Sequence, residues 1–121
     1  MIALIVDDDA PNRELLSRML SRLGWLSESA SCCSEACDAC SRVRYDYVLL
    51  DICMPVTDGY TCAKAILAVY AREERPSGSP SHKPIFIAVS GADGLAGDDR
   101  SLFDRFLQKP YSLSELKAIL N

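Results

Sequence analysis

Short apolar segments alternate with segments of helical periodicity along this chain. The apolar segments are rich in β-branched residues; the strong ones cover residues 2–6, 47–50 and 85–89, and two weaker candidates cover residues 26–31 and 105–108. Almost continuous apolar runs of this kind are typical of strands buried on both faces. Because strand and helix alternate five times, the pattern predicts an α/β fold in which a parallel sheet is covered by helices on both sides, with right-handed crossovers.

The segments between the strands carry apolar residues at helical spacing. In the first of them the recurring residues are Leu15, Leu16, Met19, Leu20 and Leu23. Gly24 follows, as is typical of a left-handed helix stop. Further helices are expected over residues 33–43, from 58 or 59 to about 72, and over 112–120. Ser112 and Glu115 match a capping box at the start of the last one. Two glycines and two aspartates in 94–103 predict that any helix there, the fourth in chain order, is short or irregular.

Charge and hydropathy argue against several classes of protein. Thirteen basic and seventeen acidic residues give a net charge of −4, which argues against binding nucleic acid through its phosphates. No apolar segment approaches the ~20 residues that a membrane helix needs, and the amino terminus lacks the basic region and cleavage site of a signal peptide. We therefore expect a cytoplasmic protein without membrane contacts. The single histidine, His82, lies in a polar segment, which argues against a Ser-His-Asp site or a multi-histidine metal site.

Six cysteines leave three interpretations open. Their even number is compatible with a disulfide framework, but nothing in the sequence indicates secretion. Cys37 and Cys40 have the spacing of half a zinc site, yet no second pair of ligands follows at a suitable spacing. On a helix, Cys33, Cys37 and Cys40 share one face. We favour the interpretation that they are small buried apolar residues, open to adventitious oxidation.

Polar residues follow the predicted strands at the point where each strand ends. In chain order they are Asp7, Asp8, Asp9, Asp51, Ser90 and Lys109. Ligands of doubly wound sheets bind at the carboxyl ends of the strands, so we expect these side chains to converge. Each also has a simple structural explanation when taken alone; Asp9 or Asn12, for example, fits a helix cap. Clustered carboxylates repel one another unless a cation neutralises them, and Mg²⁺ (or Mn²⁺) is the natural ion for oxygen ligands.

Such a site has the parts that phosphoryl transfer needs. A divalent cation, a lysine and a hydroxyl around one carboxylate form a binding site for a phosphoryl group. Lys109 would supply the positive charge and Ser90 the hydrogen-bond donor. Asp51 would then be the nucleophile that forms an acyl phosphate.

Four stretches of the sequence resemble the receiver domains of two-component response regulators, of the chemotaxis regulator type. They are LIVDDDAPNRELL (4–16), VLLDICMPVTDGY (48–60), IAVSG (87–91) and FLQKP (106–110), and they span essentially the whole chain. The resemblance implies one receiver domain over residues 1–121, with a doubly wound (βα)5 fold in three layers and the strand order 2-1-3-4-5. The opening Asp-Asp-Asp-x-x-Asn-Arg-x-Leu-Leu is similar to receivers of hybrid sensor histidine kinases, which relay a phosphoryl group rather than bind DNA.

The resemblance also implies roles for the residues at the strand ends. Asp51 is similar to the phosphoacceptor of the family. Asp7, Asp8 and Asp51 match its metal ligands, together with the backbone carbonyl of Cys53. Lys109 matches the lysine that pairs with the phosphoryl group, and a cis peptide bond is typical of the family between this lysine and the proline that follows.

Signalling in the family implies a partner and a switch. A phosphohistidine on a sensor histidine kinase or a histidine phosphotransfer protein donates to Asp51, and the phosphoryl group then recruits the switch hydroxyl of Ser90. Phe106 either turns inward into the space that the hydroxyl vacates or is a plain core aromatic residue. Cys53 and Ala92 stand where the family places residues that orient a water molecule, which predicts slow autodephosphorylation. The oligomeric state stays open, and the domain would promote its own phosphorylation without being a conventional enzyme.

Three alternatives come from other classes of protein. A phosphatase of the haloacid dehalogenase type needs a second aspartate where Cys53 stands. A flavodoxin-like flavin binder needs a phosphate-binding loop after the first strand, where the carboxylates of Asp7, Asp8 and Asp9 would repel a phosphate. A receiver-like module that binds proteins and is never phosphorylated stays open.

Overall fold

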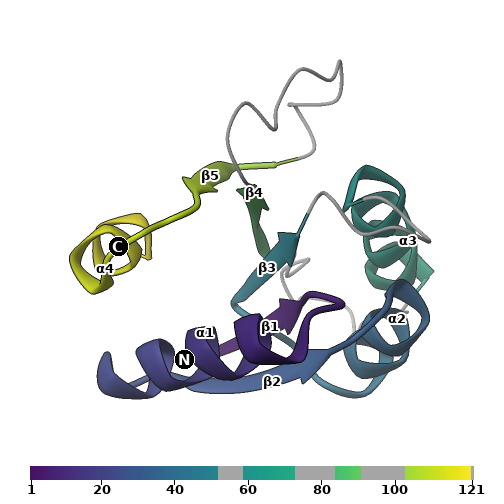
Figure 1. The fold of residues 1–121 in the computed structure, drawn as a ribbon. Helices are drawn as coiled ribbons and strands as arrows, with labels where there is room; N and C mark the ends of the chain where they lie inside the picture. The colour runs from purple at the N-terminus through teal and green to yellow at the C-terminus, as the bar shows by residue number, and fades with distance from the viewer. Residues whose placement is uncertain (52–58, 73–83, 91–102, 121) are drawn as a thin grey trace.

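The computed structural model describes residues 1–51, 59–72, 84–90 and 103–120, and five strands within these ranges form one parallel sheet (Figure 1). The strands are β1 (Ile2–Val6), β2 (Leu26–Ala30), β3 (Tyr47–Asp51), β4 (Ile85–Ser90) and β5 (Arg105–Gln108). Their order is β2-β1-β3-β4-β5, and every neighbouring pair is parallel. The order implied by the family resemblance is therefore confirmed.

Helices cover both faces of the sheet in the described part of the chain (Figure 1). They are α1 (Ala10–Arg22), α2 (Cys33–Arg42), α3 (Gly59–Arg72) and α4 (Leu113–Ile119). Side chains alternate along each strand, so Leu4 and Val6 of β1 pack in the cluster with α2 and α3, whereas Ala3 and Ile5 pack in the cluster with α1 and α4. This two-sided burial explains why the central strands have almost continuous apolar sequences.

Several predicted boundaries shift by a residue or two. β3 and β4 each continue one residue further than predicted because Asp51 is paired with Val89, and Ser90 with Gln108. α4 is shorter than the predicted segment because Ser112 and Leu120 are its caps, and the expected capping box between Ser112 and Glu115 is present. The irregular helix expected over residues 94–103 falls almost wholly on residues outside the described ranges.

The two ends of α1 show why the helix stops where it does. The Asp9 side chain accepts a hydrogen bond from the Asn12 N–H and caps the first turn. Gly24 follows the last turn with φ +83°, the left-handed conformation expected for it. Leu16 and Leu20 are buried, but Leu15 is 55% exposed, so the apolar face is narrower than the periodic set of residues predicts.

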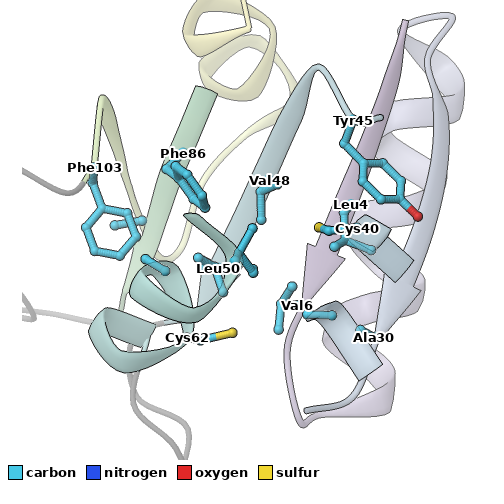
Figure 2. Packing of buried hydrophobic residues seen from close by; sticks show 14 of the residues in the cluster. Leu4, Val6, Ala30, Cys40, Tyr45, Val48, Leu50, Cys62, Phe86 and Phe103 are labelled. Carbon is cyan, nitrogen blue, oxygen red and sulfur yellow. The ribbon is translucent and has the colours of Figure 1, made fainter. Parts of the chain in front are cut away.

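The cysteines of the described residues are all free thiols, and two of them lie in the core. Cys40 and Cys62 are buried in the cluster between the sheet, α2 and α3 (Figure 2), and Cys33 and Cys37 pack against it. The structure thus favours the apolar interpretation of the cysteines over a disulfide framework; Cys53 lies outside the described residues. Within those residues, no helix has the length and apolar character needed to span a membrane.

Candidate active site

Adjacent strands bring three carboxylates together at the carboxyl edge of the sheet. β1 pairs with β3, with Val6 opposite Leu50, so Asp7 follows β1 beside Asp51 at the end of β3. Carboxylate oxygens of Asp7, Asp8 and Asp51 lie within 4.8 Å of one another. Asp7 and Asp51 are buried, whereas Asp8 is exposed. The structure therefore places the three acidic residues in one cluster, of which Asp8 is the exposed member.

The turn between β1 and α1 fixes the position of Asp7. Asp7 Oδ1 accepts a hydrogen bond of 2.9 Å from the Asp9 N–H. Arg13, one turn into α1, donates from Nη1 to the Asp7 carbonyl oxygen at 2.7 Å. The Asp9 side chain caps α1 by accepting a hydrogen bond from the Asn12 N–H, so it is not a member of the acidic cluster. Helix capping thus explains which of the three consecutive aspartates remain available to a ligand.

Lys109 extends the site from the far side of β4. It follows β5, and the Lys109–Pro110 peptide bond is cis. Its Nζ atom lies 3.6 Å from Asp7 Oδ2 and 3.9 Å from Asp51 Oδ2. The lysine is 28% exposed, so its charge acts on both buried carboxylates while one side stays open to solvent. The structure therefore places the Lys109 ammonium beside the acidic cluster, as the sequence predicts.

The pocket favours additional positive charge. Burial raises the pKa of Asp7, and the neighbouring Asp51 charge raises it further. The Asp9 N–H and the Lys109 ammonium lower the same pKa but do not compensate for these effects. The donor atoms are carboxylate oxygens, which are the ligands that Mg²⁺ and Mn²⁺ prefer. The residues present therefore fit a hard divalent cation.

The remaining predicted site residues are placed less completely. Ser90 ends β4, which lies between β3 and β5, so its backbone is at the same edge of the sheet as Asp51 and Lys109; its hydroxyl lies outside what is described. The Cys53 carbonyl and Ala92 also lie outside the described residues. The interpretation of Phe106 as a plain core aromatic is wrong, because its side chain is 36% exposed.

Two residues near the site were not predicted from the sequence. Arg13 contacts the Asp7 backbone through α1. Tyr111 is half-buried near Asp7, and its pKa is raised by burial and by the Asp7 charge. Its position directly after Lys109-Pro110 is the signal that could have identified it.

Comparison with known proteins identifies the family. The family model of the response regulator receiver domain matches residues 3–121. The chain belongs to this family. Among curated proteins, the receiver domain is 36% identical over 95% of its length to the response regulator MprA of Mycobacterium sp., and it covers 46% of that protein. It is 28% identical over 97% of its length to hybrid signal transduction histidine kinase K of Dictyostelium discoideum, of which it covers 10%. The domain thus spans less than half the length of these relatives.

Solved structures show the same fold. A CheY-like receiver domain from Methylobacillus flagellatus has 30% identity and a TM-score of 0.82, covering 99% of this chain and 95% of that one. A second structure is the receiver domain of a sensor histidine kinase from Pseudomonas aeruginosa, with a magnesium ion coordinated in its active site cleft. It has 28% identity and a TM-score of 0.77, and the match covers 98% of this chain and 93% of that one. The chain is therefore a phosphoacceptor receiver domain of two-component signalling.

Proposed function

We propose that Asp51 of this receiver domain accepts a phosphoryl group from a phosphohistidine and thereby switches the domain to a signalling conformation. The donor would be a sensor histidine kinase or a histidine phosphotransfer protein. The observation that carries the proposal is the cluster itself: Asp51 lies within 4.8 Å of two further carboxylates and 3.9 Å from the Lys109 ammonium. The domain would work in the cytoplasm. Its net charge of −4 argues against nucleic-acid contacts of its own.

Each residue of the pocket has a separate task in the transfer. A carboxylate oxygen of Asp51 attacks the phosphorus, the bond between phosphorus and the donor histidine nitrogen breaks, and an acyl phosphate forms. Asp7, Asp8 and Asp51 would hold Mg²⁺ or Mn²⁺, with the Cys53 carbonyl as a further ligand. When bound, the metal ion supplies positive charge that offsets the charge of the phosphoryl group. Lys109 is close enough to Asp51 to pair with a phosphoryl oxygen after transfer.

The switch would use Ser90 and Phe106 on adjacent strands. The backbone of Ser90 lies beside the site, and Phe106 pairs with Ala88 two residues before it. The Phe106 ring is exposed, with its centroid 6.3 Å from that of the Phe103 ring. It would turn inward when the Ser90 hydroxyl moves to the phosphoryl group. Phosphorylation shifts the population only because the phosphoryl group binds Ser90 and Lys109 better in one conformation.

The proposal is tested by phosphorylation with a small-molecule donor. Wild-type protein with Mg²⁺ and acetyl phosphate should gain the mass of one phosphoryl group, as should the control Asp38→Asn, whose side chain is exposed on α2. Asp51→Asn should gain none. Beryllofluoride, which mimics a phosphoryl group, should bind saturably to the wild type and should not bind to Asp51→Asn. Incorporation into Asp51→Asn would contradict the assignment, and no reaction of the wild type would favour a module that is never phosphorylated.

A further inference from the structure

The peptide group between Asp7 and Asp8 joins two of the three members of the acidic cluster. Because a peptide unit is planar, the direction of its carbonyl bond sets how the backbone runs from one aspartate to the next. Arg13 Nη1 donates to this oxygen, the carbonyl oxygen of Asp7, at 2.7 Å. Hydrogen bonds from a charged donor are stronger than those between neutral groups. A side chain of α1, the helix that follows β1 (Figure 1), therefore holds the backbone between two candidate metal ligands.

The other polar groups of Asp7 are also held in place. Its N–H donates to the Ala30 carbonyl oxygen of β2 at 3.1 Å, and its Oδ1 accepts from the Asp9 N–H at 2.9 Å. The backbone N–H of Arg13 donates to the Asp9 carbonyl oxygen at 3.1 Å, which closes the first turn of α1. The guanidinium contact differs from these because a substitution removes it without changing any carboxylate. Arg13 thus offers a way to perturb the acidic cluster from outside.

The position of Arg13 is unfavourable on charge alone. It is the fourth residue of α1, near the end at which the helix dipole favours acidic side chains. A positive charge beside Asp7 also repels a metal cation. Arg13 is nevertheless half-buried, whereas Arg18 on the same helix is exposed and pairs with Glu14. The hydrogen bond to the Asp7 carbonyl oxygen accounts for the position of Arg13 better than its charge does.

We propose that Arg13 is a positioning residue that strengthens metal binding by the acidic cluster, an inference that rests on the function proposed for that cluster. It acts through the peptide between Asp7 and Asp8 and not as a ligand. Asp8 is the exposed member of the cluster, so its direction depends on the backbone that carries it. Removing groups that orient metal ligands typically weakens metal binding by about 10- to 100-fold.

Metal binding in the absence of a phosphoryl donor tests the proposal. Electron paramagnetic resonance counts free Mn²⁺ as the protein is titrated, and competition measures Mg²⁺. Arg13→Met and Arg13→Gln remove the charge and are too short to reach the Asp7 carbonyl oxygen as the guanidinium does. Each should raise the dissociation constant of Mn²⁺ about tenfold. Charge alone predicts the opposite sign, because the loss of a nearby cation should tighten the binding of another.

Two further variants are matched controls. Arg13→Lys keeps a charged donor on a long side chain and should restore most of the lost affinity. Arg18→Met removes the same charge from an exposed position of α1 and should bind Mn²⁺ as wild type does. Circular dichroism in EDTA shows whether Arg13→Met and Arg13→Gln are folded, and either one suffices for the comparison. If neither folds, Arg13 supports the fold rather than the metal site, and the proposal is overturned.

Phosphorylation by acetyl phosphate gives a second readout. The Mg²⁺ concentration for half-maximal rate should rise about tenfold in Arg13→Met, whereas the maximal rate should fall by less. Wild type that binds Mn²⁺ but accepts no phosphoryl group would contradict the proposed function, and the binding constants would still test Arg13. The role of Arg13 is overturned if wild type binds no Mn²⁺, if Arg13→Met binds it as tightly as wild type, if Arg13→Lys restores nothing, or if Arg18→Met loses as much.

Discussion

Asp7→Asn tests the electrostatics of the acidic pocket, because it removes one negative charge and keeps the shape of the side chain. The asparagine oxygen can still accept the hydrogen bond from the Asp9 N–H. What changes is the charge, which is attracted by Lys109, repelled by Asp51 and penalised by burial. The free energy of unfolding of the variant therefore reports which of these effects is largest when no metal is bound.

The distances allow the competing effects to be compared. At an effective dielectric constant of about 20, the 3.6 Å contact of Asp7 with Lys109 is worth about 4.5 kcal/mol before screening, and Lys109 is partly exposed, which reduces this attraction. The Asp51 carboxylate, whose oxygen lies within 4.8 Å, repels Asp7 by at least about 3.5 kcal/mol on the same scale. These terms nearly cancel, so the burial cost of the carboxylate decides the sign. We expect metal-free Asp7→Asn to be more stable than wild type by about 1 kcal/mol.

The raised pKa of Asp7 predicts how the free energy of unfolding depends on pH. Since the pKa of Asp7 is raised on folding from its ordinary value of 3.8, the folded state binds more protons than the unfolded state between the two values. The stability that Asp7 contributes is therefore fully present at pH below 3.8 and is lost as the pH rises through the raised folded value. In EDTA this loss should be visible in wild type and absent from Asp7→Asn.

Magnesium should make wild type more stable than Asp7→Asn, the reverse of the order expected without metal. At ten times its dissociation constant, an ion that binds only the folded state stabilises it by about 1.4 kcal/mol. Wild type should gain this amount, and Asp7→Asn should gain little because it lacks one ligand. Urea unfolding in EDTA and in Mg²⁺ measures both effects, and Glu14→Gln on α1, an exposed position, controls for net charge. The reasoning is refuted if Asp7→Asn is less stable than wild type in EDTA, or if Mg²⁺ stabilises both equally.

Three further substitutions test the fold, each by urea unfolding. Gly24→Ala should lower the free energy of unfolding by about 1 kcal/mol, because φ is +83° at this residue. A Cβ atom there would meet nothing within 4 Å, so a clash would not explain the loss. An unchanged urea midpoint would contradict the conformational argument. Ser112→Ala should cost about 1 kcal/mol by removing the cap of α4, whereas Ser114→Ala, a neighbouring exposed serine, should cost clearly less. Tyr45→Phe should cost about 1 kcal/mol, because the buried hydroxyl donates to Glu28 at 2.5 Å. Burial raises the Tyr45 pKa above its ordinary 10.0, so wild type should also lose stability above pH 10 in a way that Tyr45→Phe does not.

Much of the acidic site was predictable because it depends on the ends of strands. Once residues 2–6 and 47–50 are recognised as buried neighbours in a parallel sheet, Asp7 and Asp51 must lie at the same edge. The same reasoning puts Lys109 at that edge after β5. It does not give the 3.6 Å and 3.9 Å distances, which depend on how a long side chain crosses the end of β4.

Local patterns in the sequence determined the strands, the helices and their caps, because each of these depends on neighbours a few positions away along the chain. The residues of the acidic cluster could be named because they directly follow those strands, although they are far apart in the sequence. The tertiary structure alone decided which apolar residues are covered: it leaves Leu15 and Phe106 exposed and buries Cys62. It also decided that Cys33 and Cys62 belong to one apolar cluster, since residues on two different helices come together only once α2 and α3 have packed on the same face of the sheet.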